Sequence, residues 1–289
     1  MNIIEYEQFH ELKSHFDAVR LPYNTYPCSI PLDFDMVPLH WHDEAEFIYI
    51  KKGKGIITID MEDIEVGAGD IAFLLPGQVH GIGQWHDASM EYENIIFDTK
   101  ILSGNVDGTF ESYLAPLFNN EIEIAHVFRQ GVVGYESVRH YLDENDNISS
   151  IMPQAFGLAI KGNLFSLFFN LISIYERRLE VAPLPHRIER LKPVIKYVEL
   201  NYHKPTTVAD MADLLGFSES HFMRYFKEAL GISFIAYLND YRLTMAARLL
   251  LQSEDSVLAV AEQVGFDNLS HFNRQFKKKY GKTPREYRK

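Results

Sequence analysis

The feature that most constrains how this chain can fold is an internal repeat near its C-terminus. The pattern Val-x-x-x-Ala-x-x-x-Gly-Phe at 208–217 returns at 257–266, and His-Phe-x-Arg-x-Phe-Lys-x-x-x-Gly at 221–231 returns at 271–281. The offsets are 49 and 50 residues, so the second copy gains one residue in its turn region. Residues 188–289 otherwise carry no convincing strand pattern. Two copies of one helical pattern predict a pair of helix-turn-helix units.

The residues of each copy suit a turn between two helices. The small side chains of Ala212 and Ala261 let two helices cross closely. Gly216 and Gly265 stand where the turn requires a backbone angle that other residues resist. Good N-cap residues precede the second helix of each copy, and they are Ser218, Asp267 and Asn268.

The second helix of each copy is predicted to have an aromatic face and a polar, basic face. Phenylalanines spaced four apart share a face and point into the core, and they are Phe222, Phe226, Phe272 and Phe276. The polar face can donate hydrogen bonds to base edges and phosphates. The candidate DNA contacts are Ser218, Ser220, His221, Met223, Arg224, Lys227, Asn268, Ser270, His271, Asn273, Arg274, Lys277 and Lys278. We expect Arg224 and Arg274 to contact bases, and Lys277 and Lys278 to contact phosphates.

Charge is divided unevenly along the chain. The net charge is −12, which taken alone argues against nucleic acid as a partner. Residues 190–289, however, hold 16 Lys and Arg against 11 Asp and Glu, whereas the rest of the chain is strongly acidic. This division predicts two parts with different roles, of which the basic one contacts phosphate.

The C-terminal third of the chain resembles a known family. Residues 265–288, GFDNLSHFNRQFKKKYGKTPREYR, are similar to the signature of AraC-family transcription regulators, and 241–250 resembles the helix that links the family's two units. One departure is Phe234, where the family usually has proline; Pro284 keeps it in the second copy. The resemblance implies a sequence-specific DNA-binding activator without enzymatic activity, whose partners are a double-stranded operator, RNA polymerase and a small-molecule effector such as a sugar.

The acidic half is predicted to contain short strands between residues 35 and 100. β-Branched or aromatic runs at 47–50, 56–59, 71–75 and 94–97 are separated by glycine-rich turns, among them 52–55. Many short strands with such turns indicate a sandwich or a small barrel.

A set of histidines is the main candidate for chemistry in this half. His40 and His42 are two apart and face the same way on a strand, and Glu46 keeps that parity. His80 follows the turn at Pro76-Gly77, and the whole pattern resembles the two cupin motifs. Such a set can bind zinc, iron, manganese or nickel, can line an effector pocket, or can be bonded to backbone in a barrel core.

With a DNA-binding half attached, the effector pocket is favoured. We expect it to include His40, Trp41, His42, Glu46, Tyr49 and His80, with no metal and no cofactor. The rival interpretation is a metal-dependent cupin oxygenase or isomerase with an accessory helical domain. No P-loop, dinucleotide fingerprint or nucleophile elbow supports other chemistry.

The resulting expectation is a two-domain α+β fold. Residues 1–182 form a cupin-like β-barrel with dimerisation helices, 183–187 a linker, and 188–289 an all-α domain with two helix-turn-helix motifs. The apolar helix expected within 151–180 either packs in its own domain or also pairs two subunits in a homodimer. The single cysteine, Cys28, and the lack of a bilayer-length apolar run predict a cytoplasmic protein without a membrane span.

Overall fold

The computed structural model describes residues 21–33, 35–104, 107–175 and 186–288. These residues form two compact units: the first comprises 21–33 and 41–175, and the second comprises 35–40 and 186–288. Strand β2 (Met36–His40) therefore groups by its contacts with the helical unit. The predicted linker falls outside the described residues except for 186 and 187, which begin helix α5 (His186–Asn201).

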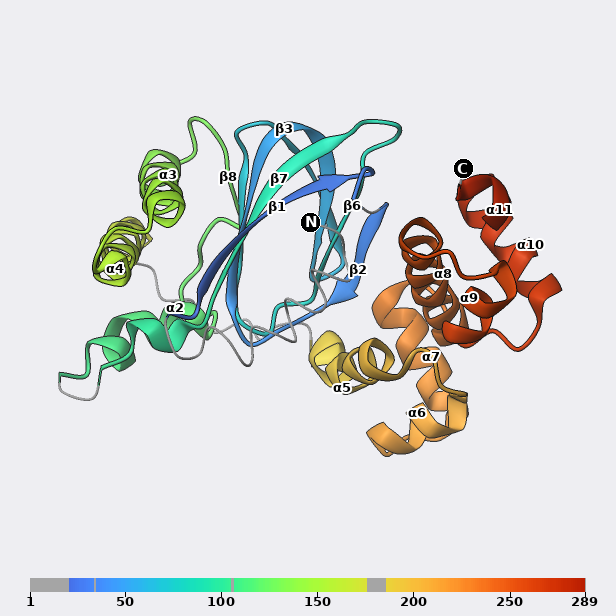
Figure 1. Ribbon diagram of the computed structural model, residues 1–289. Coiled ribbons are helices and arrows are strands. Elements are labelled where there is room, and N and C mark those ends of the chain that lie inside the picture. The colour runs from blue at the N-terminus through green and yellow to red at the C-terminus, as the bar shows by residue number, and fades with distance from the viewer. Residues whose placement is uncertain (1–20, 34, 105–106, 176–185, 289) are drawn as a thin grey trace. The chain divides into compact units, whose positions relative to one another are not determined.

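The first unit contains antiparallel strands that curve around an interior (Figure 1). The order β1 (Tyr23–Ile30), β7 (Met90–Phe97), β3 (Ala45–Ile59), β5 (Ile71–Leu74) and β8 (Val127–Phe128) forms one continuous sheet. Strands β4 (Glu62–Gly67) and β6 (His80–Gln84) pair with the second half of β3. The long strand β3 thus joins the two halves of the barrel-like domain.

The turn predicted at 52–55 is wrong, because β3 runs through it as a single strand. The pairing register with β7 shifts between Ile50 and Lys52, where a bulge bends the strand. Gly53 then has φ +76°, and a Cβ atom there would lie 1.9 Å from the Ser89 carbonyl oxygen. Glycine is therefore required for the bend and for the close approach of the neighbouring chain.

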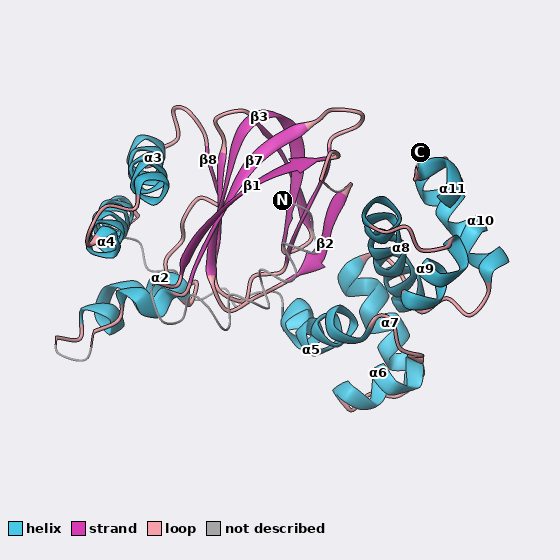
Figure 2. Cartoon of the chain, in the orientation of Figure 1, coloured by secondary structure: helices cyan, strands magenta, loops and turns pink. Residues whose placement is uncertain are grey.

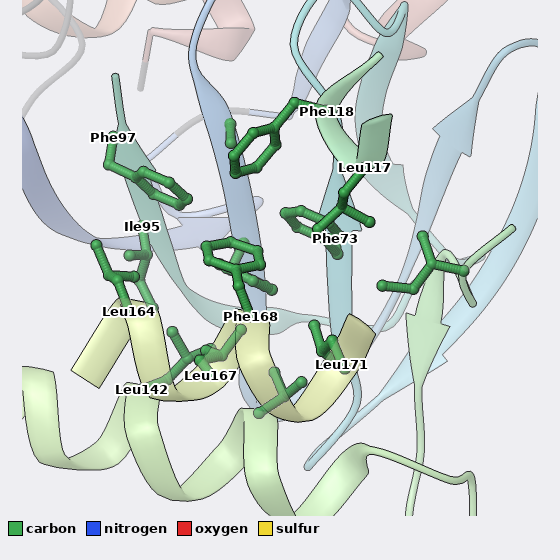
Figure 3. Close-up of a cluster of buried hydrophobic side chains, with 14 of the residues drawn as sticks. Phe73, Ile95, Phe97, Leu117, Phe118, Leu142, Leu164, Leu167, Phe168 and Leu171 are labelled. Atoms are coloured by element: carbon green, nitrogen blue, oxygen red, sulfur yellow. The ribbon is translucent and has the colours of Figure 1, made fainter. Parts of the chain in front are cut away.

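Helices cover the outer face of this sheet (Figure 2). The chain passes through η1 (Thr99–Leu102), the π-helical η2 (Phe110–Leu114) and α2 (Ala115–Phe118) to α3 (Tyr135–Ile151) and α4 (Phe156–Ile174). In Figure 3 Phe168 of α4 points between Phe73 and Phe118, with Leu164, Leu167 and Leu171 beside it. Among described helices, α4 is long and apolar enough to cross a membrane, yet its residues Leu164, Leu167 and Phe168 are buried in this protein core.

The second unit consists of helices together with β2. After α5 follow α6 (Val208–Leu215), α7 (Glu219–Leu230), α8 (Phe234–Gln252), α9 (Val257–Gln263), α10 (Leu269–Tyr280) and α11 (Pro284–Tyr287). Phe234 and Pro284 occupy the first position of α8 and α11. Proline is tolerated there because that N–H has no partner within the helix. Phe234 instead packs on Phe222 and Phe226, with ring centroids 5.5 Å away from each.

The predicted fold class is confirmed. An N-terminal antiparallel β domain precedes a C-terminal helical domain in which α6–α7 and α9–α10 form two helix-turn-helix units.

Candidate DNA-binding surface and effector pocket

The two helix-turn-helix units are built alike around their turns. Gly216 and Gly265 have φ +67° and +86°, so both occupy the left-handed region that favours glycine. The Ser218 hydroxyl accepts from the His221 N–H at 3.3 Å, and the Asn268 side chain accepts from the His271 N–H at 2.8 Å. Of the two N-cap candidates in the second copy, Asn268 holds the position. Ser218 and Asn268 thus start helices, whatever else they contact.

The aromatic faces are buried as predicted. Phe222, Phe226, Phe272 and Phe276 are each 0% exposed. Within each pair the ring centroids are 5.6 Å apart. Because the phenylalanines fix which side of α7 and α10 faces the core, the intervening polar residues must face outward.

The predicted DNA contacts lie at the surface of the second unit. The exposed ones are Ser218, Ser220, His221, Met223, Arg224, Lys227, Asn268, Ser270, Arg274, Lys277 and Lys278; His271 and Asn273 are partly buried. Arg274 and Ser270 line an open hollow of about 590 Å³ between α8 and the N-terminal end of α10. The structure therefore leaves these side chains accessible to a duplex.

One lysine of the basic run is engaged inside the unit. The Lys279 Nζ lies 2.7 Å from Asp240 Oδ1 and 2.8 Å from the Thr244 hydroxyl. Burial lowers the pKa of Lys279, and the charge of Asp240 opposes that shift. Lys277 and Lys278 remain exposed, so only these two of the three consecutive lysines are available to a phosphate.

Arg242 holds two segments of the helical unit together, and the repeat pattern did not identify it. Its Nε donates to the Tyr202 carbonyl at 2.7 Å and its Nη2 to the Lys204 carbonyl at 2.8 Å. A Cβ atom at Gly265 would lie 2.9–3.0 Å from the His203 and Tyr202 carbonyls and the Arg242 guanidinium. Arg242 therefore ties the end of α5 to α8 beside the second turn. In the sequence, Arg242 could have been selected because it follows Tyr241 at the start of the stretch that resembles the family's linking helix.

The histidine set of the first unit converges on one carboxylate. His42 Nε2 lies 2.7 Å and His80 Nε2 lies 3.1 Å from the same oxygen, Glu46 Oε2. Glu46 and His80 are each 1% exposed. His40 groups with the second unit, and His42, Glu46 and His80 belong to the first. His42, Glu46 and His80 therefore lie side by side, and their role in binding an effector stays a prediction.

Each ring of this set is oriented by a backbone carbonyl. Nδ1 of His40 lies 2.9 Å from the Pro38 oxygen, and Nδ1 of His80 lies 2.8 Å from the Gln78 oxygen. Nδ1 of His42 lies 3.1 Å from the Glu44 oxygen. The Gly77 N–H donates to the His42 carbonyl at 2.7 Å, which joins the two loops that carry the rings.

The charges of the set depend on one another. Burial alone would raise the pKa of Glu46, but His80 and His42 hold it well below its usual range. Burial alone would lower the pKa of His42, but its hydrogen bond with Glu46 and the nearby carboxylate charge raise it. The two neighbouring imidazoles therefore favour the ionised, carboxylate form of Glu46.

The structure corrects the prediction for Tyr49. Residues 46 and 49 are an odd number apart on β3, so they face opposite sides of the sheet. The Tyr49 ring packs in the core beneath the helices, with Lys51 Nζ 3.7 Å from its centroid. Tyr92 pairs with Ile50, so its side chain lies on the same face of the sheet as Glu46. Counting alternate positions along the strands would have favoured Tyr92 over Tyr49 as a pocket residue. Trp41 is half-buried next to His42.

Comparison with known proteins gives a consistent result for both units. A helix-turn-helix domain model matches residues 211–289, and a model of the AraC-like ligand-binding domain matches residues 32–152. YdeC of Bacillus subtilis (strain 168), an uncharacterised HTH-type transcriptional regulator, is 27% identical over 294 residues, which cover 100% of this chain and 98% of YdeC. YbfI from the same organism, also an uncharacterised HTH-type regulator, is 25% identical over 81% of this chain and 80% of its own length.

Two solved structures are also similar. ToxT from Vibrio cholerae, at 1.65 Å resolution, is 15% identical over 92% of this chain and 98% of its own, with a TM-score of 0.47. The C-terminal domain of the response regulator yesN from Fusobacterium nucleatum is 33% identical over 34% of this chain and 96% of its own, with a TM-score of 0.33.

Proposed function

Because this chain belongs to the AraC family of transcription regulators, we propose that it is an effector-responsive activator of genes for carbohydrate or small-molecule metabolism. The observation that carries the proposal is the pair of exposed polar faces on α7 and α10, each opposite a buried phenylalanine pair. Its partners are a double-stranded DNA operator, RNA polymerase and a small organic effector, and it acts in the cytoplasm.

Base recognition is assigned to Arg224 and Arg274, which occupy equivalent exposed positions in the two units. An arginine can form two parallel hydrogen bonds with a guanine edge in the major groove. Lys277 and Lys278 lie one turn later on α10 and are assigned to phosphates, which position the protein without specifying sequence. The two arginine contacts would fall about one helical turn apart on the duplex.

The effector is assigned to the interior of the first unit, near His42, Glu46 and His80. Tyr92 and Asn94 of β7 share the inner face with Glu46, since they pair with Ile50 and Ile48 of β3. Half-buried Trp41 supplies an aromatic surface suited to a sugar face. A pocket with a few convergent polar groups and apolar walls is typical of small-molecule sites.

A signal from this pocket can reach the helical unit through β2. Tyr237 of α8 donates its hydroxyl to the Leu39 carbonyl at 3.1 Å, and Arg248 Nη2 donates to the Met36 carbonyl at 3.3 Å. Strand β2 ends at His40, and His42 follows two residues later. A ligand that shifts His42 would therefore pull on a strand bonded to the helix between the two DNA-binding motifs, which couples the two sites.

Dimerisation is assigned to the exposed side of α4. Leu158 is 75% exposed and Phe169 is 70% exposed, although the opposite side of the helix is fully buried. Large apolar side chains exposed in this way on one helix favour a partner surface, and we assign that role to the same helix of a second copy. We expect Phe169→Glu to give monomers in sedimentation, whereas the control Leu32→Glu, at a residue 78% exposed elsewhere, leaves the dimer intact. If the Phe169→Glu protein remains dimeric, the interface does not lie on α4.

The domain division proposed is 1–182 for sensing and dimerisation, 183–187 for the linker and 188–289 for DNA binding. Limited proteolysis of the full chain should cut first within the proposed linker, 183–187. First cleavage inside either unit would contradict this division.

The decisive experiment is genome-wide mapping of bound sites, followed by footprinting of the full-length protein on a mapped site. We expect sequence-specific protection whose effect on transcription depends on an inducer from the neighbouring pathway. His42→Ala should alter that response, while His140→Ala, on the exposed surface of α3, should not. Absence of sequence-specific binding would refute the proposed function.

A further inference from the structure

One large apolar side chain stands among polar groups on the candidate DNA surface. Met223 of α7 is 48% exposed, and along α7 and α10, both of which the structure describes in full, no other large apolar side chain is as exposed. Ser220 lies three residues before Met223 and Lys227 lies four residues after it, so these side chains share one side of α7. Met223 therefore lies within the row of side chains proposed to meet the major groove.

The core of the first helix-turn-helix unit does not account for this methionine. Phe222 and Phe226 are each 0% exposed and define the buried side of α7, and Met223 lies outside it. An exposed thioether gains little from a phosphate, but it gains from an apolar group that removes it from water. In the major groove that apolar group is the C5-methyl of thymine. An unbranched, polarisable side chain adapts well to such a contact.

The second unit provides a natural comparison. The motif His-Phe-x-Arg places Asn273 of α10 at the position of Met223, directly before Arg274 as Met223 is directly before Arg224. The flanking phenylalanine and arginine are the same in both units, so the chemistry of this one side chain is what differs. An amide suits the hydrogen-bonding edge of adenine and gains nothing from a methyl group.

We propose that Met223 contacts the C5-methyl group of a thymine next to the base pair read by Arg224, and that α10 lacks this contact because Asn273 stands in its place. The inference rests on the proposed function, since it requires an operator, and it adds the class of base that the first unit recognises. An apolar contact releases no counterion from the duplex, so it contributes specificity without adding to the salt dependence of binding.

The test replaces thymine by uracil, which removes the methyl group and leaves the protein unaltered. Full-length protein is titrated at fixed salt against a mapped operator in which each thymine is replaced in turn. The base pairs at which Arg224→Ala and Arg274→Ala relax preference locate the segments bound by α7 and α10. In the α7 segment we expect one replacement to weaken binding roughly fourfold, about the effect of exposing one buried methyl or methylene group. Replacements in the α10 segment should leave affinity unchanged.

Variants at position 223 assign the effect to its side chain. Met223→Leu stays apolar and should keep the penalty for uracil. Met223→Gln and Met223→Asn should abolish the penalty, and the second of these reproduces the residue found in α10. Leu251→Gln, at a residue of α8 that is 50% exposed, is the matched control and should retain the full penalty. The slope of log affinity against log salt should be the same for Met223→Gln and the unaltered chain, because no phosphate contact is lost.

Several outcomes would overturn the inference. They are an α7 segment without thymine, an α7 segment in which no replacement by uracil weakens binding, and a penalty that persists in Met223→Gln with unchanged far-UV circular dichroism. Loss of activated transcription in Met223→Gln, with operator affinity and the penalty intact, would assign Met223 to a protein contact instead. Absence of any sequence-specific operator would refute the proposed function itself, whereas an operator that is bound regardless of its thymine methyl groups would refute only this inference.

Discussion

The two helix-turn-helix units share a core but differ in charge. Both have a left-handed glycine in the turn, a capping side chain and two phenylalanines that are 0% exposed. Helix α7, however, balances Arg224 and Lys227 with Glu219 and Glu228, whereas α10 carries Arg274 and three lysines without an acidic residue. The two copies therefore share the residues that fold each unit, while the surfaces that we propose contact DNA differ in charge.

This difference suggests a division of labour between the units. Cations that neutralise phosphates supply affinity that depends on salt, and base contacts supply specificity. A neutral α7 can read bases but contributes little to the electrostatic attraction. We infer that α10 anchors the subunit on the backbone in addition to reading a base through Arg274, and that α7 contributes mainly sequence discrimination.

The largest expected effect tests whether the two cores are equivalent. Phe226→Ala and Phe276→Ala should each reduce the free energy of unfolding by about 3–5 kcal/mol, because each removes a fully buried ring. Denaturant unfolding of the full chain, followed by far-UV circular dichroism, measures both. Met223→Ala, at an exposed residue, is the control and should remain within about 0.5 kcal/mol. A loss in only one unit would show that the cores are not interchangeable.

The next effect concerns the equivalent arginines. Arg224→Ala and Arg274→Ala should each cost about 1–3 kcal/mol on the operator and relax preference at one base pair. Binding to single-base operator variants at fixed salt identifies each position, and the two should lie about one helical turn apart. A uniform loss across all variants would make that arginine a backbone contact and would remove base reading from its unit.

The three consecutive lysines of α10 are expected to have two different roles: phosphate contact for Lys277 and Lys278, and stability of the fold for Lys279. Lys277→Ala and Lys278→Ala should each flatten the slope of log affinity against log salt by about 0.9, since each releases one phosphate contact. Lys279→Ala should leave the slope unchanged and lower stability by on the order of 1 kcal/mol, because its Nζ is bonded to Asp240 and Thr244. A salt series for the three variants measures this. If Lys279→Ala flattened the slope like the others, the internal ion pair would not persist on DNA.

Local patterns explain which of these features the sequence predicts. The phenylalanines and the turn glycines follow from helical periodicity and backbone angles, so the repeat locates them within a few residues. The engagement of Lys279 depends on Asp240, which is 39 residues away, and no local pattern contains that contact. The continuous β3 likewise depends on the approach of Ser89 to Gly53. The placement of Tyr49 in the pocket is wrong for a different reason: residues 46 and 49 are an odd number apart on one strand, which the sequence alone shows.

The smallest effect tests whether the capping residues also contact DNA. Alanine at an N-cap costs about 1 kcal/mol, whereas glycine there costs only a few tenths. Ser218→Ala and Asn268→Ala should therefore lower stability by about 1 kcal/mol, and Ser218→Gly and Asn268→Gly should restore most of it.

Operator affinity distinguishes the two roles of these residues. If capping is their role, affinity follows stability, and glycine recovers it because the start of the helix is preserved. If the hydroxyl or amide touches DNA, alanine and glycine lose affinity equally, since both lack the polar group. The Asn268 cap, at 2.8 Å, is closer than the Ser218 cap, at 3.3 Å, so the second unit should show the larger difference between alanine and glycine. If alanine and glycine at Asn268 lose affinity equally, the Asn268 side chain contacts DNA. The two units would then differ in the role of their N-cap residues as well as in charge.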